Sequence, residues 1–400
     1  MNSDLLFPGT RDLAYPEYNF VVEDLRTNRI VAEYPLKSVK YNNLIKGVGK
    51  MSGKVALTPE IMKQNPRKTL ETGIHGIYVL RNYEPVWAGI LQVTQYDEAS
   101  NTVTITANTF ENWFKARILT RDVNVKNVEQ LDIARTYVTS GDAAAALNIE
   151  VDNDTVSGFK RERNSYAYEL NTIWDELSRL SNLINGFDFR IIPYRDEVTS
   201  KLKRKLTFGY PNLSNNTPES PANLFESNRN IIDSKVTFSS DDSAMRVYAI
   251  GEGEGTTQKI AIADDTEALA AGYPRYEKSA SYKGVKVQST LISHSQSLLK
   301  ENRNPMVDIT IKVRGNDDPY VGSYAPGDWV RIKLDNIWFP EGYDNTFRIT
   351  EIEVNLEDTG RETVSMDFSG PFIRDEMVIR DSSKNVYVPP QADAPVEPGD

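Results

Sequence analysis

The chain has 400 residues, of which 39% are hydrophobic and 10% aromatic, enough to build about two to four globular domains. Its formal net charge of −11 argues against an electrostatic grip of the whole chain on nucleic acid, which needs a basic face. The absence of cysteine excludes disulfides, thiolate metal sites and cysteine nucleophiles. No signal peptide is expected at Met1–Gly9, and no stretch approaches the ~20 apolar residues that would span a membrane.

Residues 18–118 are expected to be mainly β, because short runs of β-branched and aromatic residues alternate with polar turns. A strand at Gly89–Tyr96 and a returning strand at Thr102–Ala107 form a hairpin. A short helix is expected at Phe110–Leu119. The other expected strands are Phe20–Leu25, Ile30–Leu36, Ile77–Arg81 and Val86–Ile90.

Residues 120–210 change in character and predict a small α+β domain. The apolar spacing favours helices at Asn127–Val138 and at Leu170–Ile184, the second ended by Gly186 in a left-handed conformation. A hairpin formed by Phe187–Tyr194 and Lys203–Phe208 follows.

Residues 211–232 have the proline, serine and asparagine content of a linker or long loop. Asp233–Asp367 returns to β, with helical interruptions at Asp265–Ala271 and Ser293–Glu301. Residues 381–400 form a proline-rich acidic tail that we expect to be disordered. The strands expected after residue 233 are Lys235–Ser239, Met245–Gly251, Val307–Arg314, Asp328–Leu334 and a closing hairpin.

The closing hairpin repeats the pattern of the first one about 250 residues later. Phe347–Leu356 alternates like Gly89–Tyr96, and Glu362–Phe368 returns like Thr102–Ala107. A β-rich run containing tryptophan precedes each hairpin. Two similar β-modules around a different middle indicate a duplicated scaffold and not an enzyme built around one cleft.

Candidate catalytic and metal-binding residues are few. The two histidines, His75 and His294, have no i,i+4 spacing, and no Gly-x-Ser-x-Gly elbow accompanies them, so packing or surface roles are favoured. Asp152–Asp154 and Gly251–Gly255 lack the order of a calcium loop. Gly47–Lys54 has five residues between Gly47 and Gly53, where a phosphate-binding loop has four. We therefore predict no catalytic, cofactor-binding or metal-binding residues and no cofactor.

Two further patterns have ordinary structural interpretations. The basic run Lys201–Lys205 is predicted to be a solvated hairpin turn. Tyr320, Tyr324 and the pair Trp338–Phe339 could stack on sugars, although aromatic residues in strands more often belong to a core. Carboxylate pairs for glycoside hydrolysis stay possible, but nothing in the sequence selects one pair.

The run Ala325–Leu334 predicts a type II turn at Pro326-Gly327 that starts a strand. Trp329, Arg331 and Lys333 share one face of this strand, opposite Val330, Ile332 and Leu334. The pattern is typical of a half-buried barrel strand.

Several of these segments, in this order, resemble the siphophage tail-tip or baseplate hub proteins of the Gp37-like minor tail protein family. The resemblance covers about residues 15–380. The segments that carry it are Phe20–Leu36, Val86–Ile90 with its hairpin, Trp113–Arg117, Leu170–Ile184 with Gly186–Arg190, and Tyr324–Lys333.

The resemblance implies two β-barrel domains like the tail-tube protein, on either side of a smaller helical or α+β domain. Such proteins form trimers around the tail axis, so three chains with two barrels each match a hexameric tube. The expected division is 1–119 for the first barrel domain, 120–210 for the middle domain, 211–232 for the linker, 233–380 for the second barrel domain with a helical insertion, and 381–400 for the tail.

The function implied is that of a non-enzymatic hub in the virion, made in the cytoplasm of the host bacterium. It would join the tail tube and the distal tail and tape-measure proteins to tip fibres or receptor-binding proteins, and would leave a channel for phage DNA. The alternatives are a carbohydrate-binding or glycan-cleaving tail module and a monomeric β-rich binding protein.

Overall fold

A computed structural model describes residues 16–369 except 184, 215, 242, 283–284, 304–305 and 359. The expected disordered tail, 381–400, lies outside the described residues. The described chain divides into two compact units, the first formed by residues up to Lys235 together with Thr310–Phe368, and the second by Val236–Ile309. The chain passes from one unit to the other within β14 (Ile231–Ser239) and β18 (Met306–Arg314).

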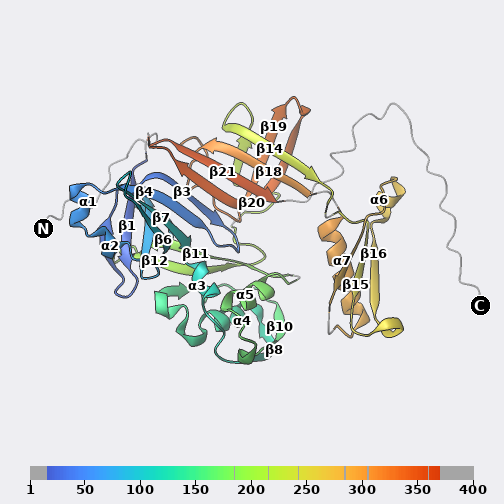
Figure 1. The fold of residues 1–400 in the computed structure, drawn as a ribbon. Helices are drawn as coiled ribbons and strands as arrows, with labels where there is room; N and C mark the ends of the chain where they lie inside the picture. Colours follow the sequence, from blue (N-terminus) through green and yellow to red (C-terminus); the bar gives the residue numbers. More distant parts are fainter. Residues whose placement is uncertain are drawn as a thin grey trace, which may run out of the picture. The chain divides into compact units, whose positions relative to one another are not determined.

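The N-terminal module, β1 to β7, is an antiparallel arrangement with the strand order β2-β1-β5-β6-β7-β4-β3 (Figure 1). The hairpin predicted between residues 89 and 107 is confirmed as β6 and β7. The distal half of β6, Gln92–Asp97, is exposed, whereas Val103 and Ile105 of β7 are buried. Two short helices, α1 (Pro59–Lys63) and α2 (Pro66–Thr69), connect β4 to β5. The strands are β1 (Tyr18–Asp24), β2 (Arg29–Glu33), β3 (Lys37–Leu44), β4 (Lys50–Ala56), β5 (His75–Arg81), β6 (Glu84–Asp97) and β7 (Thr102–Thr109).

The middle segment, residues 120–210, does not have a core of its own. Its buried side chains, among them Leu131, Leu177 and Phe208, belong to one cluster with Tyr78 and Phe110 of the N-terminal module. The middle segment therefore packs on one face of the N-terminal sheet. Its strands are β8 (Val123–Glu129), β9 (Ile149–Val151), β10 (Lys160–Ser165), β11 (Asp188–Arg195) and β12 (Leu202–Gly209), and its α-helices are α4 (Gln130–Val138) and α5 (Ile173–Ser181), with α3 (Glu111–Lys115) preceding them.

Both predicted middle helices exist but are shorter than expected. Helix α4 begins at Gln130 and not at Asn127, because residues 123–129 pair with β10 as strand β8. Helix α5 begins at Ile173, where Thr172 and Asp175 form a reciprocal capping box. It ends at Ser181, and the residue with positive φ after it is Asn185, not the predicted Gly186. The predicted hairpin that follows is confirmed as β11 and β12.

The C-terminal module consists of β13 (Asn223–Glu226), β14, β18, β19 (Trp329–Asn336), β20 (Phe339–Leu356) and β21 (Glu362–Ser369). The expected linker at 211–232 contains β13, which pairs in parallel with β19. The predicted strand after Pro326-Gly327 is β19, with Val330, Ile332 and Leu334 buried as the alternation indicated. The predicted closing hairpin is confirmed as β20 and β21.

The two modules share one 13-stranded sheet, because β20 pairs with β3 in antiparallel register from Glu351↔Leu44 to Leu356↔Val39. Figure 1 shows the blue N-terminal strands and the orange and red C-terminal strands side by side. The mainly β character predicted from the sequence is confirmed. The two separate barrels that we expected are not confirmed. Among the described residues the strand order stays open, from β14 at one edge to β2 at the other.

The second unit is a three-stranded sheet, in the order β16-β15-β17, with α7 packed on it. The helical interruptions predicted inside the C-terminal β region are α6 and α7, both of which lie here. Helix α7 begins at Gln288, five residues before the predicted start at Ser293. The elements are β15 (Arg246–Ile250), β16 (Ile260–Asp264), β17 (Glu277–Ser281), α6 (Thr266–Ala270) and α7 (Gln288–Asn302).

Candidate assembly surfaces and the seams behind them

The two histidines have packing roles and lie in different units. His75 is buried at the start of β5, and its Nδ1 lies 3.2 Å from the carbonyl oxygen of Glu71. The ring of His294 on α7 stacks on Tyr282 with centroids 4.2 Å apart, and burial lowers its pKa. Within the described residues, no three His, Asp or Glu side chains are arranged to hold a metal ion.

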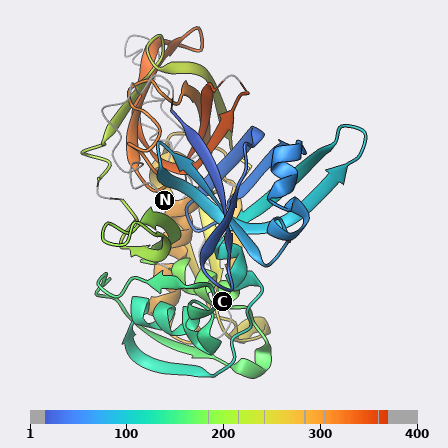
Figure 2. The ribbon, with the colours of Figure 1, turned by 90° about the vertical axis from the view of Figure 1, so that its left-hand side faces the viewer.

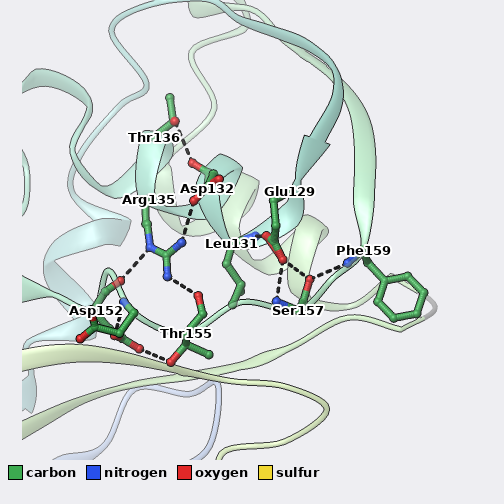
Figure 3. A network of polar contacts seen from close by, with 10 residues as sticks. Glu129, Leu131, Asp132, Arg135, Thr136, Asp152, Thr155, Ser157 and Phe159 are labelled. Carbon is green, nitrogen blue, oxygen red and sulfur yellow. Dashed lines mark hydrogen bonds and ion pairs between the residues drawn. The ribbon is translucent and has the colours of Figure 1, made fainter.

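Asp152, a candidate calcium ligand in the sequence, belongs to a hydrogen-bond network that connects the loop at 152–159 to α4 (Figure 3). Its carboxylate accepts hydrogen bonds from the N–H of Asp154 and, at 2.6 Å, from the hydroxyl of Thr155. Burial opposes its ionisation, but these hydrogen bonds outweigh that effect and lower its pKa. Arg135 of α4 donates to the carbonyl oxygens of Asp152 and Thr155. The Asp152 carboxylate itself stabilises the loop by accepting hydrogen bonds from within it.

Glu129 belongs to the same hydrogen-bond network. Its carboxylate accepts hydrogen bonds from the N–H of Leu131, which caps α4, and from the N–H and hydroxyl of Ser157. The hydroxyl of Ser157 in turn accepts from the N–H of Phe159. The network in Figure 3 therefore stabilises the local backbone.

The basic run predicted to be a solvated turn contains a buried arginine. Arg204 of β12 is buried and donates to Glu23 of β1 at 2.6 Å and to the Tyr78 hydroxyl at 2.9 Å. Its guanidinium also lies 4.3 Å from the centre of the Phe110 ring. Because β12 pairs with β11, alternate residues turn inward, and Arg204 points into the core that the middle segment shares with the N-terminal module.

A second buried ion pair joins the two β-modules. Arg81 of β5 and Glu362 of β21 make two hydrogen bonds of 2.7 and 3.0 Å, and their side chains are only 5% and 1% exposed. The hydroxyl of Tyr18 donates to the same carboxylate. Burial and the nearby Tyr41 and Glu362 raise the pKa of Tyr18 well above its ordinary value, which keeps this tyrosine a donor.

The third pair joins the C-terminal module to the middle segment. Arg348 of β20 binds Asp188 at the start of β11, and the same carboxylate oxygen accepts from the N–H of Leu213 at 2.8 Å. The N-terminal module, the middle segment and the C-terminal module meet at three interfaces, here called seams, and each seam has an arginine–carboxylate pair. The paired residues are 281, 181 and 160 positions apart in the sequence. Sequence reasoning missed these pairs, because no local pattern marks partners so far apart.

The most exposed apolar side chains of the C-terminal module lie at the tip of the β19–β20 hairpin. Ile337 is 100% exposed and Trp338 is 72% exposed. Tyr320 is also exposed, whereas Tyr324 is buried, so only some of the aromatic residues weighed for sugar stacking reach solvent. A fully exposed isoleucine beside an exposed tryptophan is typical of a surface that binds another protein.

The β6–β7 hairpin and the sheet edges also expose apolar side chains. Val93 and Tyr96 are exposed on the hairpin that extends beyond the rest of the N-terminal sheet (Figure 2). The edge strand β2 exposes Ile30 and Val31, and the opposite edge strand β14 exposes Ile232. An edge strand has unpaired backbone donors and acceptors, so another chain can add to it.

Comparison with solved structures identifies the architecture. A tail protein from Neisseria meningitidis MC58 superposes with a TM-score of 0.62 at 12% identity, over 88% of this chain and 96% of that one. The chain has the fold of a phage tail protein. The 43 kDa tail protein of prophage MuSo2 from Shewanella oneidensis gives 0.60 at 14% identity over 88% and 98%, and prophage tail protein gp18 from Listeria monocytogenes EGD-e gives 0.55 at 12% over 87% and 94%.

The similarity to phage tail proteins predicted from the sequence is confirmed at the level of the fold. No protein-family model matches the chain, and no curated protein matches its sequence. The likeness is therefore carried by backbone arrangement over nearly the whole length. In the described part of the chain, no helix is both long and apolar enough to cross a membrane.

Proposed function

We propose that this protein is a non-enzymatic structural component of a phage tail tip. It forms a homotrimeric, pseudo-hexameric ring that joins the tail tube and distal tail protein to the tip fibres or spike. The observation that carries the proposal is the tail-protein fold, which extends over 88% of the chain and nearly all of the Neisseria and Shewanella tail proteins. The tape-measure protein and receptor-binding proteins are further expected partners, and the site of action is the virion, after synthesis in the host cytoplasm.

The three seams support a role as a rigid connector. A connector has to transmit force between tube and tip, so its parts should not rotate against one another. The pairs Arg81–Glu362, Glu23–Arg204 and Asp188–Arg348 place one buried or mostly buried ion pair at each seam of the first unit. A shared sheet through β3 and β20 adds continuous backbone pairing between the two modules.

The exposed hairpin tip and edge strands support assembly with further chains. Ile337 and Trp338 lie at one end of the 18-residue strand β20, far from the β3 pairing at its other end. The edge strand β2 is a second, different exposed surface of the first unit. Contact between two different surfaces is head-to-tail, and such contacts close into a ring when the rotation fits.

Sedimentation equilibrium of the full chain, alone and with the tail-tube or distal tail protein, tests the ring. A trimer in either sample supports the proposal. A chain that stays monomeric in both samples supports the alternative of a monomeric binding protein. Trp338→Ser should weaken assembly, whereas Val198→Ser, at an exposed position on the β11–β12 turn, serves as the matched control.

The net charge of −11 supports a channel through which DNA passes without binding, since like charge opposes adsorption. The assembled ring should show no DNA retention in a filter-binding assay at 50 mM potassium chloride. Retention that disappears as the salt is raised would contradict this part of the proposal.

A carbohydrate-binding tail module is the second candidate, because Trp338 and Tyr320 are exposed aromatic side chains that could stack on sugar rings. Titration of the chain with host cell-wall polysaccharide, followed by tryptophan fluorescence and by release of reducing sugar, decides between the two. Saturable quenching that Trp338→Ser removes would favour the carbohydrate module, and sugar release would favour glycan cleavage.

A further inference from the structure

A small cavity of about 10 Å³ lies inside the first unit, between strand β11 and the loop that connects β3 to β4. Strands β6 and β7 complete its wall. Glu111, the first residue of α3, and Arg190 of β11 both line it. A cavity of this size has the space that one water molecule needs.

The local structure brings the two charged side chains to the same cavity. Along β11, Phe189 and Ile191 point into the core that the middle segment shares with the N-terminal module, so Arg190 points to the opposite face. The N–H of Lys46 donates to the carbonyl oxygen of Phe189 at 3.3 Å, which holds the β3–β4 loop against this strand. The N–H of Ile191 donates to Oε1 of Glu111 at 2.6 Å, which places the carboxyl beside Arg190.

Two buried polar atoms at this cavity have no hydrogen-bond partner among the described residues, namely Oε2 of Glu111 and Nη1 of Arg190. The two atoms therefore do not bond to each other, although Glu111 is only 2% exposed. Thr109 also lines the cavity, but its hydroxyl oxygen already accepts from the N–H of Gly49 at 3.0 Å. Since buried polar groups are nearly always hydrogen-bonded, an acceptor and a donor at one cavity indicate a ligand between them.

The charges at the cavity decide which kind of ligand can satisfy both atoms. A metal ion at Oε2 of Glu111 would be repelled by the guanidinium of Arg190, and an anion at Nη1 would be repelled by the carboxylate. Burial lowers the pKa of Arg190 while the charges of Glu111 and Asp328 raise it, and an arginine side chain stays protonated in proteins. The ligand is therefore a neutral molecule that both donates and accepts, and the volume admits water and nothing larger.

We propose that one ordered water molecule binds in this cavity, accepting a hydrogen bond from Nη1 of Arg190 and donating one to Oε2 of the Glu111 carboxylate. A water bridge is nearly as favourable in enthalpy as a direct hydrogen bond. This bridge connects α3, at the end of the N-terminal module, to β11 of the middle segment. The proposal concerns the chain by itself and does not rest on the proposed function, so its experiments need no other tail protein.

A crystal structure of the unmodified chain at pH 8, at a resolution that shows ordered water, tests the site without any substitution. We expect one isolated density peak at about 2.7–3.2 Å from both Oε2 of Glu111 and Nη1 of Arg190. A cavity without a peak, or an Arg190 side chain in direct contact with Glu111, would overturn the proposal. A peak with contacts shorter than about 2.5 Å would mark a metal ion and would also overturn it.

Oxygen-17 relaxation dispersion counts long-lived bound waters in solution and gives an independent measurement. Glu111→Leu with Arg190→Met removes both polar atoms and leaves neither charge unpaired, so the count should fall by about one relative to the unmodified chain.

The matched control is Arg331→Met with Asp344→Leu, which removes an ion pair whose side chains are 49% and 40% exposed. This control should leave the count of bound waters unchanged. An unchanged count in the Glu111 and Arg190 variant would overturn the proposal, and so would an equal fall in the variant and the control.

Discussion

Replacing Glu362 by glutamine should destabilise the first unit strongly, because it leaves the Arg81 charge buried without its counter-charge. At 2.7 Å and an effective dielectric constant of about 20, the Coulomb attraction between the two groups is about 6 kcal/mol before the cost of burial. The amide of glutamine keeps part of the hydrogen bonding. Removal of one partner of a buried pair typically costs about 3–5 kcal/mol, and we expect a loss in that range.

Urea unfolding followed by tryptophan fluorescence measures this loss in the right part of the molecule. All five tryptophans lie outside Val236–Ile309, so the signal reports the first unit and not the second. A loss of about 3–5 kcal/mol is a large share of the roughly 5–15 kcal/mol that stabilises a typical protein. The midpoint of the Glu362→Gln curve should therefore fall clearly below that of the unmodified chain.

The matched control is the exposed pair of Arg331 and Asp344, which has the same two-bond geometry, with both bonds at 2.6 Å. Its side chains are 49% and 40% exposed, so water screens the pair and Asp344→Asn should leave the midpoint nearly unchanged. Equal shifts in Glu362→Gln and Asp344→Asn would refute the reasoning, because burial would then make no difference. Arg81→Met with Glu362→Leu should recover part of the loss, since neither charge remains.

Three further predictions test other parts of the fold. Arg204→Met should cost about 3–5 kcal/mol in the same assay because Glu23 stays buried without its partner, and a change below 1 kcal/mol would contradict this. Thr172→Ala should cost about 1 kcal/mol because the hydroxyl accepts from the N–H of Asp175 at 3.0 Å, whereas Thr199→Ala on an exposed turn should not. Burial raises the pKa of the Glu111 carboxyl above its ordinary 4.5, so the folded chain keeps a proton that the unfolded chain has released. The free energy of unfolding should then fall as the pH rises from 4.5 through the raised pKa. Arg190 is the charged group that faces the Glu111 carboxyl. In urea titrations at pH 4.5 to 8, Glu111→Gln should flatten this pH dependence.

Local patterns predicted many of the elements but not their ends. The alternation in residues 89–107 and 347–368 predicted both hairpins, because a half-buried strand has a period of two whatever it packs against. We predicted that α4 starts at Asn127, and this was wrong because Val128 fits the apolar spacing of a helix as well as that of a strand. Only the pairing of β8 with β10 shows that Asn127 and Val128 belong to a strand.

The sequence by itself determined the mainly β composition, the two similar hairpins, the lack of thiol chemistry and the resemblance to tail proteins. These follow from residue types and short-range spacing. The tertiary structure decided that the two modules share one open sheet, that the middle segment has no core of its own, and that three arginine–carboxylate pairs close the seams. These depend on residues 160 to 281 positions apart, and a charge has no period along the chain that would reveal its partner.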